Sequence, residues 1–158
     1  MTPADLPALL AVADIVHPTY PEDAAVFEER LALFPAGCLV LDQGGSLIGY
    51  ILSHPWTYAA PPALNSLLAA LPTPPTTYYI HDIALLPGAR GTGAANIVVQ
   101  QLIKLAETLR LPNLSLTAVN NSVAFWRRHG FVLTPIPALD AKLRSYDEEA
   151  RFMVRAIA

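Results

Sequence analysis

A glycine-rich turn near the middle of the chain has the residue types to bind a phosphate group. Residues 90–95 read Arg-Gly-Thr-Gly-Ala-Ala, after a strand-like run at 78–85 and before an amphipathic helix-like run. Glycines in such a turn allow backbone N–H groups to point at one spot, where the positive end of the helix dipole also lies. The segment therefore predicts a site for a phosphate or pyrophosphate.

Other ligand-binding patterns fit the chain less well. A Walker loop needs Gly-Lys followed by Ser or Thr, and the sequence lacks that combination. A dinucleotide-binding turn needs an acidic residue about 20 residues downstream, but no Asp or Glu lies between Glu107 and Asp140. The four histidines, at positions 17, 54, 81 and 129, are widely scattered, so no metal site is predicted.

Local patterns predict ten elements around this turn. They are helices at 2–17 and 21–34, strands at 38–41, 47–53 and 78–86, a helix at 93–110, a strand at 114–119, a helix from 120 to about 129, and strands at 131–134 and 151–157. An early hairpin beside a strand–helix–strand crossover indicates an α/β fold with a mixed sheet and helices on both faces.

Three details of these elements are specific expectations. The helix at 93–110 should bury the apolar stripe Val98, Leu102, Leu105 and Leu109. The side chains of Asn120, Asn121 and Ser122 should cap the helix that follows them. Residues 54–76 should form a long loop with a short helix at 63–70, and this loop and the first two helices should shape an acceptor pocket.

Composition limits the classes of protein to which the chain can belong. Its 158 residues are 53% apolar and 15% charged, which favours one globular domain spanning 1–158. The net charge of −3 argues against nucleic-acid binding, and no apolar run is long enough for a membrane span. A single cysteine, Cys38, and an N-terminus without early positive charge favour a cytoplasmic protein without a secretory signal.

Two blocks of sequence resemble the GNAT superfamily of acyl-CoA N-acetyltransferases. Arg90, Gly93 and Ala95 match the defining positions of the family's pyrophosphate loop. Residues 120–131 resemble its second block, in which asparagine, a helix and an aromatic pair precede Gly-Phe, and 49–50 resembles the Gly-Tyr ending of its hairpin strand. The resemblance covers roughly 1–157 and implies a GNAT-like fold.

The resemblance also implies acetyl-CoA as co-substrate. Backbone N–H groups of 91–96 would hold the pyrophosphate, and the strand end at 83–85 would bond the acetyl carbonyl and pantetheine amides where a bulge parts two strands. Asn120 or Asn121 would contact the pantetheine arm. The implied CoA contacts are Ile83, Ala84, Leu85, Arg90, Gly91, Thr92, Gly93, Ala94, Ala95, Asn96, Asn120, Asn121 and Trp126.

His81 is the preferred general base, acting directly or through a water. An imidazole with an ordinary pKa of about 6.5 suits this work near neutral pH, and His81 resembles a histidine of the serotonin N-acetyltransferase branch. Strand alternation would place Tyr79, His81, Ile83 and Leu85 on one face, and Ile80, Asp82 and Ala84 on the other. Asp82 would then orient a neighbouring group, and the alternative for His81 is a hydrogen-bonded core histidine.

Two further side chains have competing interpretations. Many family members carry tyrosine where this chain has Trp126, and an indole N–H cannot protonate a leaving CoA thiolate. Trp126 is therefore expected to pack against CoA or the core, while water or Tyr146 supplies the proton. His54 is expected to be a loop residue, with a substrate-lining role as the alternative.

The leading hypothesis for function is an N-acetyltransferase. It would move an acetyl group from acetyl-CoA to a primary amine of a small molecule or peptide, by direct attack in a ternary complex. The alternative is a non-catalytic acyl-CoA-binding sensor or partner-binding module. The resemblance also makes a homodimer an expectation.

Overall fold

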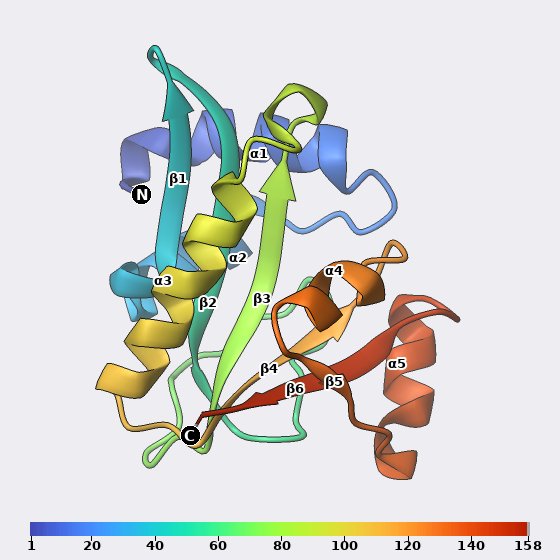
Figure 1. The fold of residues 1–158 in the computed structure, drawn as a ribbon. Coiled ribbons are helices and arrows are strands. Elements are labelled where there is room, and N and C mark those ends of the chain that lie inside the picture. The colour runs from blue at the N-terminus through green and yellow to red at the C-terminus, as the bar shows by residue number, and fades with distance from the viewer. Residues whose placement is uncertain (158) are drawn as a thin grey trace.

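A mixed six-stranded sheet is the centre of the structure, a computed structural model that describes residues 1–157 (Figure 1). Its strand order is β1-β2-β3-β4-β6-β5, and within the described chain β3 and β4 form the one parallel pair. The strands are β1 (Cys38–Gln43), β2 (Ser46–Trp56), β3 (Thr77–Leu85), β4 (Asn113–Ala118), β5 (Val132–Leu133) and β6 (Arg151–Ala156).

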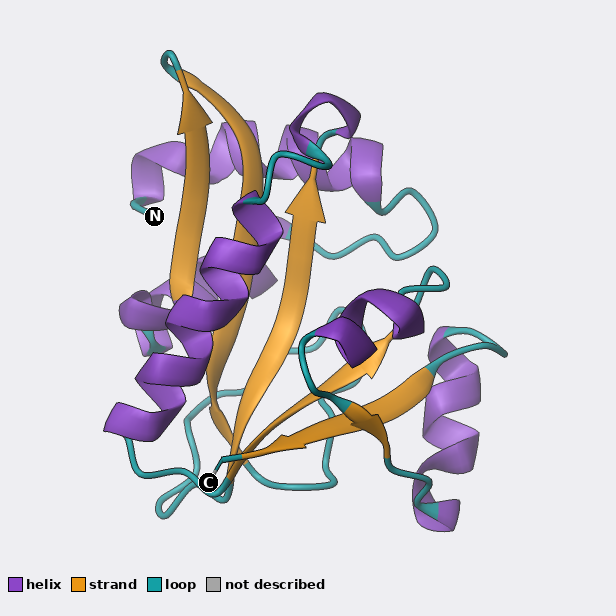
Figure 2. Cartoon of the chain, in the orientation of Figure 1, coloured by secondary structure: helices purple, strands orange, loops and turns teal. Residues whose placement is uncertain are grey.

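Helices cover both faces of the sheet, as expected for the α/β class (Figure 2). Helices α1 (Leu6–Val16) and α2 (Ala24–Leu33) bury Leu9 and Phe27 against one face. Helices α3 (Ala94–Thr108) and α4 (Val123–Arg128) bury Leu102 and Trp126 against the other. A further helix, α5 (Asp140–Tyr146), packs through Leu143 on β6. No helix among residues 1–157 has both the length and the apolarity to cross a membrane.

The buried face of α3 differs from the predicted stripe. The residues of α3 that lose nearly all their exposure are Val99, Leu102, Ile103 and Ala106, whereas Leu109 remains 39% exposed. Positions 99, 102, 103 and 106 also have the i, i+3, i+4, i+7 spacing of a helix face. The sequence therefore contains two overlapping apolar stripes, and contact with the sheet decides between them.

Strands β3 and β4 separate part-way along their length. They pair in register only from Tyr78 with Leu114 to Ile80 with Leu116, and beyond this point their directions diverge (Figure 1). Residues 82–85 of β3 therefore pair with β2 on one side only. Backbone groups on the other side of this segment remain available to a ligand.

A β-bulge in β3 accompanies the separation. Asp82 pairs with Leu52 and Ile80 pairs with Ser53, so His81 is an extra residue on β3. Two residues then face one on the partner strand, which shifts the alternation of side chains.

The predicted distribution of side chains along β3 is wrong because of this bulge. His81 and Asp82 lie on the same side and line the same cavity. Ile80 and Ile83 both contribute to the core beneath α3, whereas Ala84 belongs to the core on the α1–α2 side.

Other local expectations also need correction. Strand β2 extends to Trp56, so His54 is a strand residue and not a loop residue. No helix forms at 63–70, because Asn65 and Ala69 have positive φ and the segment bonds instead to side chains of the α2 region. No side-chain bond caps α4, and Asn120 and Asn121 instead adopt left-handed conformations.

Candidate active site

A cleft with a volume of about 400 Å³ opens where β3 and β4 diverge. Ile83 and Leu85 line it from β3, Thr117 from β4, and Trp126 from α4, while Ala95 lies at the start of α3. Its walls are thus mostly apolar and are framed by strand ends whose backbone is partly unpaired. This arrangement suits an extended, flexible ligand arm with amide groups.

The glycine-rich turn lies at the α3 end of this cleft. Gly91 and Gly93 have φ values of +76° and +87°, which L-residues rarely adopt. Within residues 1–157, the backbone N–H groups of Gly91, Thr92, Gly93, Ala95 and Asn96 have no hydrogen-bond acceptor. Successive unpaired N–H groups at a helix N-terminus form an anion-binding concavity.

A smaller cavity of about 60 Å³ lies on the α1–α2 side of the sheet. It is lined by three tyrosines, two histidines, two carboxylates and several smaller or apolar side chains, namely His17, Tyr20, Glu22, Pro62, Leu64, Tyr79, His81, Asp82, Thr117, Val119 and Tyr146. His17, His81, Asp82, Thr117 and Val119 also line the larger cleft. The two cavities therefore meet at these five residues.

His81 forms one of two imidazole–carboxylate pairs at this junction. Its Nε2 is hydrogen-bonded to Oε1 of Glu22 at 2.8 Å, and each side chain is 7% exposed. The other oxygen of Glu22 accepts the backbone N–H of Asn65 at 3.0 Å. Burial raises the pKa of Glu22, but the hydrogen bond and charge of His81, together with the Asn65 N–H, outweigh it and hold this pKa below its ordinary value.

His17 and Asp82 form the second pair. Nε2 of His17 lies 2.7 Å from Oδ1 of Asp82, and the Tyr50 hydroxyl donates to Oδ2 of the same carboxylate at 2.5 Å. Burial opposes charge on both partners, but their mutual contact, together with neighbouring hydrogen bonds and charges, outweighs it. The pKa of His17 is raised and the pKa of Asp82 is lowered.

Sequence reasoning missed both His17 and Glu22. His17 follows the last residue of α1, and Glu22 lies just before α2. The local sequence indicates only that each residue lies near a helix end, beside Pro18 or Pro21. Only the packing of the α1–α2 segment against β3 reveals their proximity to His81 and Asp82.

The predicted CoA contacts are partly brought together. Ile83, Leu85, Arg90, Ala95, Asn120 and Trp126 line the larger cleft. Ala84 faces the opposite core, Ala94 lines a separate apolar groove, and Asn121 is exposed outside the cleft. The side chains of four other predicted contacts do not line the larger cleft, but their backbone N–H groups are unpaired in the glycine-rich turn and the first turn of α3. These are Gly91, Thr92, Gly93 and Asn96.

Trp126 and Tyr146 occupy different surroundings. Trp126 is buried, and its ring packs edge-on against Phe131 at a centroid distance of 5.3 Å. Tyr146 is the last residue of α5, a helix not predicted from the sequence, and its hydroxyl donates to the carbonyl oxygen of Pro62. Burial raises the pKa of Tyr146, so this phenol stays protonated. It lines the smaller cavity but not the larger cleft.

His54 lines neither cavity. It is 1% exposed, and its ring lies beside Trp56 and Tyr79. Burial lowers the pKa of His54 to about 3, so the ring is neutral. Among residues 1–157, no group of three or more His, Cys, Asp and Glu side chains is arranged to hold a metal ion.

Comparison with known proteins agrees with this architecture. The sequence profile described as "Acetyltransferase (GNAT) family" matches residues 8–131. The chain belongs to this family. The matched region of this GNAT acyltransferase includes the glycine-rich turn, the divergent strands and the α4 aromatic pair. A search of curated protein sequences gives no significant match.

Solved structures share the GNAT fold over nearly the whole chain. Ard1 from Thermoplasma volcanium has a TM-score of 0.76 and 17% identity, covering 100% of this chain and 95% of that one. Naa20 of Chaetomium thermophilum, solved with a bisubstrate analogue, has a TM-score of 0.74 and 20% identity, covering 99% and 84%. GphF, a GNAT-like decarboxylase in complex with isobutyryl-CoA, has a TM-score of 0.78 and 16% identity, covering 99% and 96%.

Proposed function

We propose that this GNAT protein transfers an acetyl group from acetyl-CoA to the primary amine of a small molecule, by direct attack in a ternary complex. The observation that carries the proposal is the junction of the two cavities beside the His81–Glu22 pair. Naa20, which shares the fold and was solved with a bisubstrate analogue, supports a site that holds two substrates together. Cytoplasmic location and a homodimer stay predictions from the sequence.

The larger cleft fits the chemistry of an acyl-CoA. The unpaired N–H groups from Gly91 to Asn96 suit the pyrophosphate, and Arg90 adds positive charge beside them. The free edge of β3 at 83–85 offers backbone donors to the thioester carbonyl and to the pantetheine amides. Acetyl-CoA supplies an acyl group that is activated as a thioester.

His81 has the position of the general base for the acceptor amine. It lines both cavities, so it can reach an amine in the smaller one and face a thioester in the larger one. Glu22 holds one ring nitrogen and stabilises the imidazolium that forms when His81 takes the proton. The amine nitrogen then forms the new C–N bond, and the C–S bond breaks.

The size of the acceptor cavity favours a small amine over a peptide. Its volume is about 60 Å³, and the irregular segment 57–76, which we term the strap, covers it with Pro62 and Leu64. Glu29 accepts two strap N–H groups, those of Leu68 and Ala69, at 2.7 and 2.8 Å. A folded-in strap with these bonds leaves little room for an extended chain.

Release of CoA thiol with a panel of short primary amines tests the proposal. We expect turnover with acetyl-CoA, and we expect His81→Gln to reduce kcat about 100-fold while the Kd for acetyl-CoA stays unchanged. His54→Gln is the matched control, since His54 is buried nearby but lines neither cavity. Tight binding of acetyl-CoA without turnover of any amine would favour the sensor alternative.

A further inference from the structure

The transfer of an acyl group from CoA to an amine moves two protons, and His81 accounts for only one of them. The amine loses a proton to His81, and the departing thiolate must gain a proton. This second proton comes either from water or from a further side chain at the junction of the cavities. Five residues line both cavities, and three of them have side chains that titrate: His17, His81 and Asp82.

Other donors near the cleft are poorly suited to protonate a thiolate. The indole N–H of Trp126 is a hydrogen-bond donor but not a useful acid. The Tyr146 hydroxyl already donates to Pro62 and lies in the smaller cavity only. The Tyr50 hydroxyl donates to Asp82, and burial raises its pKa, so it holds its proton strongly.

His17 differs from these groups in position. It follows Val16 at the end of α1, and both residues line the larger cleft. Its Nε2 lies 2.7 Å from Asp82, and only 15% of the side chain is exposed. Tyr50 fixes the other oxygen of Asp82 from β2, so the carboxylate has a defined orientation toward the imidazole.

Two carboxylates close to His17 favour its protonated form. Asp82 on β3 and Glu22 before α2 both raise its pKa, against the effect of burial. Asp14 of α1, Tyr20 and Tyr50 share a small cavity with it. Two basic groups near the larger cleft would oppose a positive charge on His17. His81 on β3 is paired with Glu22, and Arg90 donates to the Leu85 carbonyl.

We infer that His17, oriented by Asp82, is the acid that protonates the departing CoA thiolate. The amine nitrogen forms the C–N bond, and the C–S bond breaks with its electron pair on sulfur. Nε2 of His17 lies against Asp82, so the proton on Nδ1 passes to that sulfur, and the amine proton passes to His81. Solvent later restores both rings, so the balance needs no other reactant. This inference rests on the proposed acyl transfer.

The pH dependence of kcat at saturating acetyl-CoA tests this assignment. The wild-type protein should lose activity at low pH, as the base is protonated, and at high pH, as the acid is deprotonated. His17→Gln should lower kcat about 100-fold and remove the high-pH fall. His81→Gln should instead remove the low-pH fall, and the Kd for acetyl-CoA should remain within about twofold in both variants.

Asp82→Asn gives an independent measurement on a protein that retains the ring. It removes the carboxylate that favours imidazolium, so the high-pH fall should move to lower pH. His129→Gln is the control, because His129 is buried beside Phe125 but lines neither cavity. This variant should leave both the low-pH fall and the high-pH fall in kcat unchanged.

The possible outcomes separate the two proposals. If the wild-type protein transfers the acetyl group but His17→Gln and Asp82→Asn leave the high-pH fall where it was, the role of His17 is overturned and the proposed function stands. If the wild-type protein binds acetyl-CoA and acetylates no amine, the proposed function fails and this inference fails with it.

Discussion

At the junction of the two cavities, each buried carboxylate contacts one imidazole. Glu22 bonds His81, and Asp82 lies against His17. Removing one partner would leave a poorly solvated charge, so each pair should affect stability as well as chemistry. The two effects have different dependence on pH, which allows them to be measured separately.

The His17–Asp82 pair should stabilise the fold most strongly in mildly acidic solution. The pKa of Asp82 is lowered from 3.8, so its contribution is complete above that value and is lost as pH falls through the lower, folded pKa. The pKa of His17 is raised from 6.5, so its contribution is complete below that value and is lost as pH rises through the higher, folded pKa. The contribution of the pair is therefore complete between pH 3.8 and 6.5.

His17→Gln should consequently lower the free energy of unfolding by about 2 kcal/mol at pH 5.5, and by less at pH 9. Urea denaturation of the wild type and the variant at both values measures the difference. An equal loss at the two values would contradict the charged pair.

Gly93 should be required for binding CoA because its φ of +87° sets the direction of the turn's N–H groups. Gly45 has a matching φ of +86° in the β1–β2 turn, and at both positions the space that a Cβ atom would occupy has no neighbouring atom within 4 Å. Alanine at either position should cost about 1–2 kcal/mol of stability. Only Gly93→Ala should also weaken CoA binding, by about tenfold.

Thermal shift with and without CoA distinguishes these two effects. Both variants should have a lower melting temperature than the wild type. The increase in melting temperature that CoA causes should be smaller in Gly93→Ala alone. If CoA raises the melting temperature of Gly93→Ala as much as that of the wild type, the turn is not part of the CoA site.

At the scale of elements, the strap controls the size of the acceptor cavity. Glu22, Asp23 and Glu29 hold it from the α2 side through hydrogen bonds to strap residues, and the Tyr146 hydroxyl holds Pro62 from α5. Anchors from the α2 side and from α5 make the strap a fixed wall, and its side chains then decide which amines fit.

Leu64→Ala should therefore enlarge the range of accepted amines. Leu64 lines the acceptor cavity, and loss of its isobutyl group should raise kcat/KM for amines one or two methylenes longer by about tenfold. Leu67→Ala is the control, because Leu67 belongs to the same strap but is 59% exposed and lines no cavity of the site. An unchanged chain-length profile in Leu64→Ala would show that the strap does not set selectivity.

Elements with strong local signals were predictable from the sequence. The β1–β2 hairpin, β3 and α3 all have clear turn residues or periodic apolar residues. The bulge at His81 was not predictable at its position, because register depends on β2 and not on β3 alone. Helix α5 was missed because its seven residues bury little besides Leu143.

In the candidate site too, features with a local sequence signal were predictable and contacts between distant residues were not. The glycine turn is local in sequence, so its residues and its place before α3 follow from the pattern. His81 was identified by its type and its strand, but Glu22 lies 59 residues away from it. A contact of this kind depends on how α1 and α2 pack on the sheet, which no local pattern specifies.

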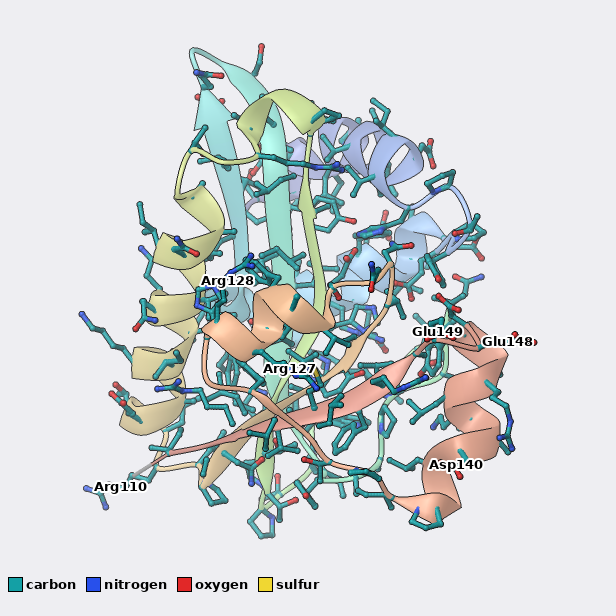
Figure 3. The ribbon with its side chains drawn as sticks, turned by 45° about the vertical axis from the view of Figure 1, so that its right-hand side comes forward. Arg110, Arg127, Arg128, Asp140, Glu148 and Glu149 are labelled. Atoms are coloured by element: carbon teal, nitrogen blue, oxygen red, sulfur yellow. The ribbon has the colours of Figure 1, made fainter. Side chains whose placement is uncertain are left out.

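On the scale of the whole molecule, charge is unevenly distributed despite the net value of −3. Figure 3 shows Arg127 and Arg128 on α4, the helix that lines the larger cleft, and Glu148 and Glu149 beside the end of α5. Arg90, in the glycine-rich turn, also lines the cleft. A strongly anionic ligand such as CoA should therefore be attracted to the α3–α4 side in spite of the overall negative charge.

Arg90→Gln should weaken CoA binding about tenfold in dilute buffer, and by much less in about 0.5 M salt, where screening is strong. Arg110→Gln is a control of equal charge, since Arg110 lies beyond the far end of α3 (Figure 3). Titrations at two salt concentrations measure the effect. If both variants bind equally well, long-range attraction and not Arg90 itself would account for the affinity.

Calorimetric titration of the wild-type protein with acetyl-CoA is the most direct test that the cleft between β3 and β4 is an acyl-CoA site. ATP and NADH serve as comparison ligands, because they also carry phosphates but lack the pantetheine arm. We expect saturable binding of acetyl-CoA near 1:1 and much weaker binding of the other two. No binding of acetyl-CoA by the folded protein, or equal binding of all three ligands, would contradict the account.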